Sequence, residues 1–209
     1  MLMERRAFLA RSAAAGAAAW AVPEVLSMDP VAAAVGSCPG LAVYEFVGGL
    51  DGWTIFNSWG PGAAGLWGQN SEIDRDGGSL HYGRGSAGNY DTGGRNSGRI
   101  RSPNYSVPSE GVNSVTFTVM RDVELRAGGE HDLLQLTTQQ GSKSEVLWSA
   151  GSDGGTGGQF EFHIVTIPAH LNGNNVRFHF EFDTVDGLNN DGEGIYIGRF
   201  EITGCPADP

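Results

Sequence analysis

The sequence is poor in positive charge and in long apolar runs. It contains a single lysine, Lys143, and 13 basic against 24 acidic residues, which gives a net charge of −11 at pH 7. Nucleic acids and anionic membrane surfaces attract proteins through positive charge, so neither is an expected partner. The sustained apolar run at residues 13–22 is shorter than the about 20 residues of a membrane-spanning helix. We therefore expect no membrane insertion.

The chain also lacks common catalytic motifs. There is no G-x-S-x-G nucleophile turn and no H-E-x-x-H zinc helix, and the five histidines fall on separate segments without ligand spacing. Glycosidases need two carboxylates about 5–10 Å apart, but a chain this acidic meets that condition by chance. We therefore predict no catalytic residues, and an extracellular hydrolase acting on polysaccharide is kept as the alternative.

Residues 1–34 have the pattern of a cleavable export signal. A basic start leads into an Ala-rich apolar run, Pro23 interrupts it, and the small residues of "VAAA" (31–34) offer a cleavage site. The signal predicts a secreted or cell-surface protein. About 175 residues, 35–209, then form one mature domain.

The route of export is indicated by a pair of arginines. Arg5 and Arg6, followed by "FL", resemble the twin-arginine signal, which exports folded proteins. Glu4 and Ala10 depart from the usual flanks of that signal, so plain secretory export stays open, as does a lipobox at "VGSC" (35–38).

The chain contains only two cysteines, Cys38 and Cys205, one at each end of the mature domain. In an exported chain two cysteines pair more often than they stay free. A Cys38–Cys205 disulfide would close nearly the whole domain into one loop, for which the chain-entropy model gives roughly 5 kcal/mol as an upper figure. It requires the first and last strands to lie side by side.

What the mature chain has in abundance is alternation with a period of two. Apolar residues share one face in "SVTFTVM" (114–120) and in "VRFHFEF" (176–182), which puts Arg177, His179 and Glu181 on the other face. We also expect strands at "AVYEF", "DLLQLTT", "FEFHIVTI" and "IYIGRFEI", loops at 60–79, 83–99 and 149–159, and a helical turn at 168–173. Sheets with one apolar face must pack on each other, so the sequence predicts an all-β antiparallel sandwich.

Seven motifs follow one another between residues 43 and 204: "LDGW", "SLHYG", "NYDTGG", "GRIRSPNYSVP", "VTFTVMRDVE", "HDLLQLTT" and "IPAHLNGNNVRFHFEFDTVDGLNNDGEGIYI". In this order they resemble the MAM-like, galactose-binding-like jelly-roll modules attached to secreted bacterial peptidases such as immune inhibitor A. The resemblance implies a single jelly-roll β-sandwich with adjacent termini, a role in recognising glycans or proteins, and often structural calcium. It is an analogy of fold and does not settle function.

The resemblance also marks a departure. The family commonly ends in a pattern like G-W-Y-I-D-D-V, whereas this chain has Ile195 at the Trp position and Gly198-Arg199 at the acidic pair. If that pair binds a metal in relatives, this chain has lost part of the site, and Arg199 would neutralise what is left.

Two groups of acidic residues are candidates for a calcium site. Calcium takes six to eight oxygen ligands, usually with several carboxylates. The first group is the Gly-rich loop "FDTVDGLNNDGEG" (182–194), with Asp183, Asp191 and Glu193 as main ligands beside Asp186 and Asn189. The helical calcium-loop motif fails there, because Phe200 stands at its twelfth position. A solvated acidic turn is the alternative.

The second group comes from the family comparison and contains Glu45, Asp91, Glu124 and Asp132. Carboxylates that converge from separate segments repel one another unless a cation lies between them. The alternative is that each carboxylate pairs with an arginine or accepts hydrogen bonds in a turn, as "NYDTGG" would in an Asx turn.

Two tryptophans are candidates for ligand contact. Trp59 and Trp67 lie in the Gly-rich "NSWGPGAAGLWGQN" (57–70), where burial on a strand is least expected. Exposed aromatic rings stack on sugars, whereas buried ones would fill the ends of the sandwich. The sequence thus predicts a secreted non-catalytic module that binds a glycan or extracellular protein and is stabilised by calcium. A structural surface or matrix subunit is a further alternative, and the sequence does not indicate an oligomeric state.

Overall fold

The computed structural model describes residues 40–58, 60, 63–70, 78–84, 88–124, 132–150 and 155–205, without the side chains of residues 63, 64 and 205. Apart from one turn of 3-10 helix, the regular structure of these residues is β. The elements are β1 (Gly40–Tyr44), β2 (Thr54–Phe56), β3 (Ala63–Ala64), β4 (Trp67–Asn70), β5 (Ser79–Tyr82), β6 (Asn96–Arg101), β7 (Tyr105–Ser106), β8 (Val112–Asp122), β9 (Leu133–Gln140), β10 (Lys143–Ser149), β11 (Glu161–Thr166), η1 (Ala169–Leu171), β12 (Asn175–Asp183) and β13 (Gly194–Cys205).

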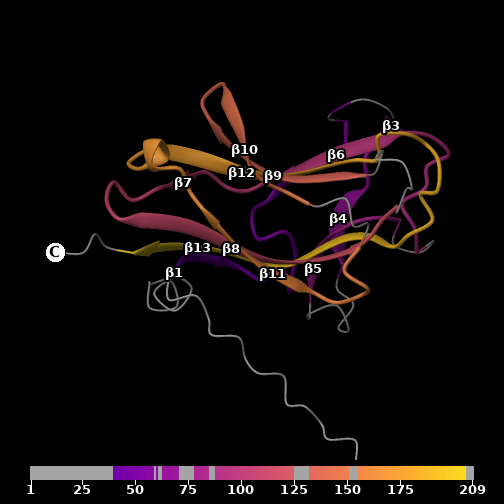
Figure 1. Ribbon diagram of the computed structural model, residues 1–209, viewed down its shortest axis with the longest axis horizontal. Helices are drawn as coiled ribbons and strands as arrows, with labels where there is room; N and C mark the ends of the chain where they lie inside the picture. Colours follow the sequence, from indigo (N-terminus) through magenta and orange to yellow (C-terminus); the bar gives the residue numbers. More distant parts are fainter. Residues whose placement is uncertain are drawn as a thin grey trace, which may run out of the picture. The chain divides into compact units, whose positions relative to one another are not determined.

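The strands form two sheets that stack as layers (Figure 1). The β8 sheet has the order β11-β8-β13-β5-β4, with β1 paired to β13. The β12 sheet has the order β10-β9-β12-β6-β2, with β7 on β12 and β3 on β6. The pairings are antiparallel except for the two-residue β3, which runs parallel to β6. The predicted antiparallel jelly-roll β-sandwich is therefore confirmed.

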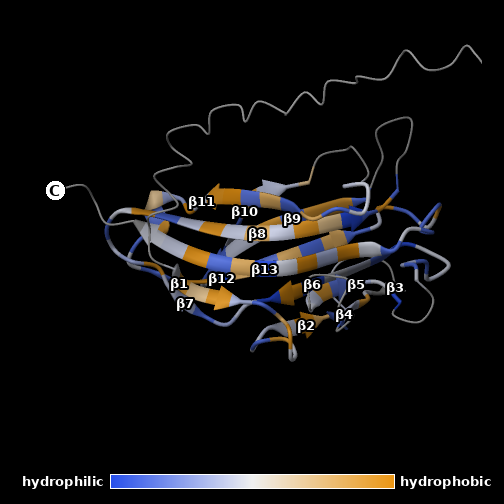
Figure 2. Cartoon of the chain, turned by 90° about the horizontal axis from the view of Figure 1, so that it is seen from below, coloured by the Kyte–Doolittle hydropathy of each residue, from blue (hydrophilic) through white to orange (hydrophobic). Residues whose placement is uncertain are grey.

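The alternating pattern of the sequence builds the core between the sheets. Phe178, Phe180 and Phe182 of β12 point inward and are buried, as is Phe117 of the facing β8. The Phe117 and Phe180 rings meet edge to face with 5.3 Å between their centroids, a contact that adds about 0.5–1.5 kcal/mol beyond area burial. Figure 2 shows hydrophobic and hydrophilic residues alternating along the strands of the β8 sheet.

The long strands expected from alternation are present as β1, β8, β9, β11, β12 and β13, and the helical turn expected at 168–173 is η1. The expected loop at 60–79 is wrong in part, because β3, β4 and the first residue of β5 lie in it. The expected loop at 83–99 is also wrong in part, because β6 begins at Asn96. The strand β10 was also not expected, since its residues show no clean alternation.

The two ends of the domain are adjacent in the β8 sheet, because β1 pairs with β13 and Gly40 faces Thr203. This is the geometry that a Cys38–Cys205 disulfide requires. Cys38 and the Cys205 side chain lie outside the described residues, so the disulfide stays a prediction. The expected export signal, residues 1–34, also lies outside them. Within the described ranges, the chain has no helix with the length and hydrophobicity of a membrane span.

Candidate ligand-binding face

Polar and aromatic side chains gather on the outer face of the β12 sheet. Because the phenylalanines of β12 point into the core, the residues between them point outward. Strands β2, β6, β12 and β9 pair so that the outward residues of neighbouring strands lie opposite one another in rows across this face. We call this the β12 face, formed by Phe56, Arg99, Arg101, Gln135, Thr137, Arg177, His179 and Glu181.

Glu181 is held in place at the centre of the face. Arg99 Nη2 lies 2.7 Å from Glu181 Oε1, and the Thr137 hydroxyl donates a hydrogen bond of 3.1 Å to the same oxygen. Glu181 is buried, so the charged partner and the hydrogen bond compensate for its desolvation. The polar groups of the face are thus partly pre-arranged.

His179 is a buried polar side chain on this outward face. It lies directly opposite Arg101 on β6 and Thr137 on β9, yet it is fully buried. Neither ring nitrogen has a hydrogen-bond partner among the described residues, and Nδ1 lies 3.7 Å from Glu181 Oε1. Burial lowers the pKa of His179, which is raised in turn by Glu181 and lowered by Arg99 and Arg101. A neutral imidazole with unused hydrogen-bonding capacity therefore lies beneath the face.

A cavity of about 230 Å³ opens beside these residues and is lined by Phe56, Ser58, Arg99 and Arg101. The Arg101 guanidinium carbon lies 4.5 Å from the centre of the Phe56 ring, in cation–π geometry. The cavity is smaller than the roughly 300–1,000 Å³ typical of small-molecule sites. It suits one sugar ring or one substituent, while the rest of an extended ligand would lie across the open sheet.

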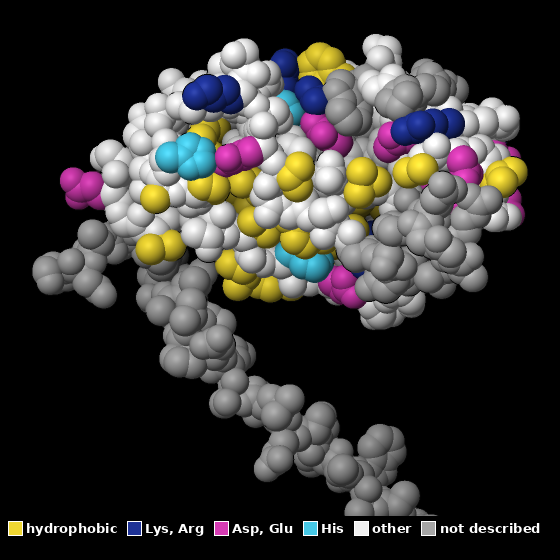
Figure 3. Space-filling view, turned by 45° about the horizontal axis from the view of Figure 1, so that its top comes forward, with side chains coloured by type: hydrophobic (Ala, Val, Ile, Leu, Met, Phe, Trp, Pro, Cys, Tyr) yellow, Lys and Arg dark blue, Asp and Glu magenta, His cyan; other side chains and the backbone are white. Residues whose placement is uncertain are grey.

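Figure 3 looks obliquely onto this side of the molecule. Dark blue Lys and Arg side chains lie close to a cyan histidine and to magenta carboxylates over the β12 sheet. Planar guanidinium groups, an amide, a hydroxyl and a carboxylate on one flat surface can donate and accept hydrogen bonds to ligand hydroxyls. Phe56 supplies an apolar surface for stacking.

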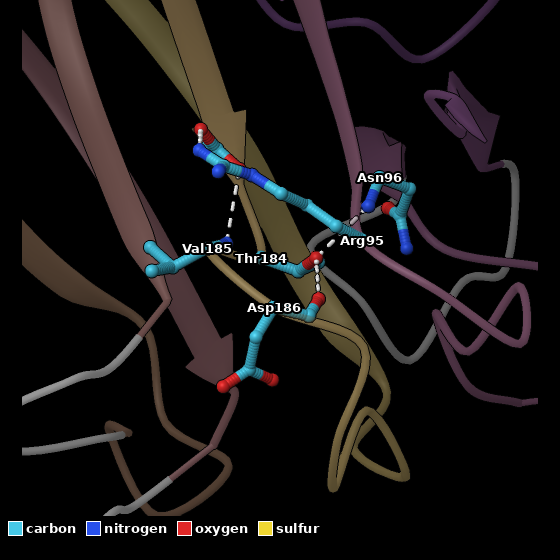
Figure 4. A network of polar contacts seen from close by, with 6 residues as sticks. Arg95, Asn96, Thr184, Val185 and Asp186 are labelled. Carbon is cyan, nitrogen blue, oxygen red and sulfur yellow. Dashed lines mark hydrogen bonds and ion pairs between the residues drawn. The ribbon is translucent and has the colours of Figure 1, made fainter. Parts of the chain in front are cut away.

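The acidic loop 182–194 lies at one end of this sheet, and its carboxylates are used locally (Figure 4). Asp183 accepts two hydrogen bonds from Arg95, at 2.9 and 2.6 Å. Its Oδ1 also accepts from the Val185 amide at 2.9 Å, and Asp186 accepts from the Leu188 amide at 2.7 Å. These are the turn contacts expected of a solvated acidic loop.

The other two calcium candidates of this loop lie further along it. Asp191 is exposed, and the Glu193 amide donates to Asp122 at 2.9 Å.

Of the four carboxylates expected to converge from separate segments, Glu124 and Asp132 come together. Both are buried, and the Glu124 amide lies 3.4 Å from Asp132 Oδ2. The Tyr90 hydroxyl donates to the same Asp132 oxygen, and Asn189 donates to Glu124 Oε1 at 3.0 Å. This group joins the end of β8 to the start of β9 and to the acidic loop.

Glu45 lies elsewhere, so the expected convergence of four carboxylates is wrong. Residue 44 pairs with Phe200 of β13, whereas Asp122 pairs with Gly194, six residues earlier on that strand and about 20 Å away. Glu45 instead lies 3.8 Å from Arg199 Nη1, and Arg199 Nη2 lies 2.8 Å from Glu201. Arg199 therefore does lie among carboxylates at the position where the sequence suggested a lost acidic pair.

Asp91 forms the Asx turn named as its alternative, accepting a hydrogen bond of 2.7 Å from the Gly93 amide. Among the described residues no three His, Cys, Asp or Glu side chains are grouped so that they could hold a metal ion. Calcium binding stays a prediction that would need further oxygen ligands.

The expectation of an exposed Trp67 is wrong. Its side chain is 3% exposed, and its ring packs edge to face on Tyr82 with 5.3 Å between centroids. Gly98 opposite leaves room for it, since a Cβ there would lie 3.0 Å from the Trp67 ring. Trp59 lies outside the described residues.

The residues of the β12 face were missed as a site, although the sequence carried a signal for them. Alternation in "VRFHFEF" placed Arg177, His179 and Glu181 outward, and "RIR" at 99–101 has the same period. What the sequence did not show is that β6 and β12 are neighbours in one sheet, which places these side chains together.

No family model matches this chain, and no curated protein matches it. Among solved structures, carbohydrate-binding module CBM27-1 of Caldicellulosiruptor saccharolyticus, in complex with mannohexaose, aligns with a TM-score of 0.51 at 15% identity, over 80% of this chain and 98% of that chain. The K1 cleaved adhesin domain of Lys-gingipain from Porphyromonas gingivalis W83 gives 0.49 at 15% identity (80% and 98% covered). The xylan-binding module CBM15 gives 0.47 at 18% identity (80% and 99% covered). At such low identity the CBM27-1 likeness shows a shared jelly-roll fold and nothing about the ligand.

Proposed function

We propose that this protein is an exported, non-catalytic binding module that recognises a glycan with the β12 face. The observation that carries the proposal is the arrangement of this face: a Phe56 cavity beside hydrogen-bonding side chains that are already held in position. Sugars bind to such surfaces by stacking their apolar ring faces and by exchanging hydrogen bonds with fixed polar groups.

The test is affinity electrophoresis of the purified protein in gels that contain single polysaccharides, neutral and acidic. Retardation by at least one polysaccharide is expected. Phe56→Ala should weaken that binding by at least about tenfold, since an aromatic anchor contributes 1.4 kcal/mol or more. Phe162→Ala is the matched control, because Phe162 is 63% exposed and lies on β11 of the other sheet. Equal loss in both variants, or no retardation by any polysaccharide, would contradict the proposal.

Two other functions predict different results with the same purified protein and polysaccharides. A hydrolase would release reducing sugars from the polysaccharides, whereas a binding module retains them without turnover. A structural subunit would assemble with rising protein concentration, which sedimentation would detect. If the ligand is an extracellular protein instead, no polysaccharide should retard this protein in the gels.

A further inference from the structure

The β12 face concentrates arginines on a chain with a net charge of −11. Arg99 and Arg101 lie on β6, and Arg177 lies on the neighbouring β12. At physiological salt, charges further away than about 8 Å are largely screened. A ligand at this face therefore meets these arginines rather than the acidic residues elsewhere on the molecule.

The carboxylates on this side of the sheet are already occupied. Glu181 is paired with Arg99 and accepts a hydrogen bond from Thr137, and Asp183 accepts hydrogen bonds from Nε and Nη2 of Arg95. Neither Arg101 nor Arg177 forms a side-chain ion pair or hydrogen bond with any described residue. The contact that Arg101 makes through its guanidinium is the stacking on Phe56.

Arg101 is also a costly place for an unpaired positive charge. It is partly buried, and burial lowers its pKa, as do the nearby charges of Arg177 and Arg99. Arg177 lies diagonally across from Arg101, which faces His179, and like charges near each other repel. An anion bound at this place would relieve the repulsion, and a guanidinium binds planar oxyanions with two parallel hydrogen bonds.

We propose that the glycan recognised by the β12 face carries oxyanion groups, uronate carboxylates or sulfate esters, and that Arg101 binds one of them in the cavity beside Phe56. Arg177, on the neighbouring strand β12, provides a second positive charge on this face. This inference rests on the proposed function, because it names the chemical class of the ligand of the same face.

The test compares each anionic polymer with its neutral counterpart, using the full protein in titration calorimetry. Polygalacturonate is paired with its methyl-esterified form, and dextran sulfate with dextran. We expect binding of one anionic polymer, loss of binding to its neutral counterpart, and weakening as sodium chloride rises. Binding of polygalacturonate would identify the carboxylate as the source of the oxyanion, and binding of dextran sulfate alone would identify the sulfate ester.

Arg101→Gln should weaken this binding by at least about tenfold, as expected for loss of a charged hydrogen-bonding partner. Arg199→Gln removes an exposed arginine from the other sheet and should leave the affinity unchanged. Should Arg101→Gln not fold, Arg101→Lys keeps the charge without the planar fork and should weaken binding by a smaller factor.

Two results would overturn the inference and leave the proposed function standing: equal affinity for charged and neutral counterparts, or an Arg101→Gln affinity equal to wild type while Phe56→Ala abolishes binding. If no polysaccharide of either kind binds, the proposed function itself falls.

Discussion

Tyr90 donates a hydrogen bond from its phenol to Oδ2 of Asp132, which is 42 residues further along the chain, and both side chains are buried. The same phenol oxygen accepts a hydrogen bond of 2.9 Å from the Glu124 amide. Asp132 Oδ1 has no hydrogen-bond partner among the described residues. A carboxyl group in this position is stabilised in its neutral form, because burial removes the water that would solvate its charge.

This environment predicts that stability depends on pH through Asp132. Burial raises the pKa of the Asp132 carboxyl to about 7, against the hydrogen bonds from Tyr90 and the Glu124 amide, which lower it. The native state then keeps a proton that the unfolded chain releases above pH 3.8. The stability that comes from burying Asp132 as a neutral carboxyl is present in full below pH 3.8. It falls as the pH rises and is lost above about pH 7, so the free energy of unfolding decreases over this range. Thermal midpoints measured between pH 4 and pH 8 in the presence of a chelator should show the decline.

Asp132→Asn cannot ionise and should flatten that decline, so that the wild type loses stability relative to the variant as the pH rises. Asp191→Asn alters an exposed carboxylate and should keep the wild-type profile. Parallel profiles for wild type and Asp132→Asn would show that the carboxyl is not protonated in the native state.

Calcium is predicted to stabilise the protein through the same region. Asn190, next to the Asn189 that bonds Glu124, has a buried side-chain oxygen without a hydrogen-bond partner among the described residues, and amide oxygens are calcium ligands. A site with a dissociation constant of about 10 μM would add about 2.7 kcal/mol at 1 mM calcium, or about 5–11 °C in the midpoint. Loss of the shift in Asp132→Asn would assign it to the buried pair, and loss in Asp191→Asn to the acidic loop. A midpoint that does not move with calcium contradicts the prediction.

A disulfide between Cys38 and Cys205 is predicted by the register of the two terminal strands. Gly40, two residues after Cys38 in the sequence, faces Thr203, two residues before Cys205, in the β1–β13 pair. Mass spectrometry of an unreduced digest should find the two cysteine peptides linked. Reduction should lower the thermal midpoint of the wild type but not that of a variant with both cysteines changed to serine. Free thiols in the folded protein would refute the link.

Gly194 is predicted to be intolerant of any side chain. Its φ of +96° is disfavoured for other residues, and a Cβ would meet the Tyr82 carbonyl oxygen across the β13–β5 pair. Gly194→Ala should therefore lower the free energy of unfolding by at least about 2 kcal/mol in urea denaturation. Gly68→Ala, where a Cβ would meet nothing within 4 Å, should stay within about 0.5 kcal/mol of wild type. Similar values for the two variants would speak against the clash.

The fold was readable from sequence because most of its long strands alternate, with β10 as an exception. Each apolar residue of 176–182 had to share a face with the next but one, so the core positions of β12 followed from pattern alone. The short strands β2, β4 and β7 were not readable, since two to four residues cannot show a period. Trp67 was misjudged for a related reason: its Gly-rich surroundings suggested a loop, but β4 carries it into the core.

The sequence by itself determined the sandwich, the outward direction of Arg177, His179 and Glu181, and the adjacency of the first and last strands that the resemblance implied. Only the tertiary structure decided which side chains share a site. Strand order places Arg101 opposite His179 although they are far apart in the chain, and it separates Glu45 from Glu124 although both are acidic strand-end residues. The reason is physical: the period of a strand depends on its own residues, whereas its neighbours are chosen by hydrogen bonding and packing over the whole domain.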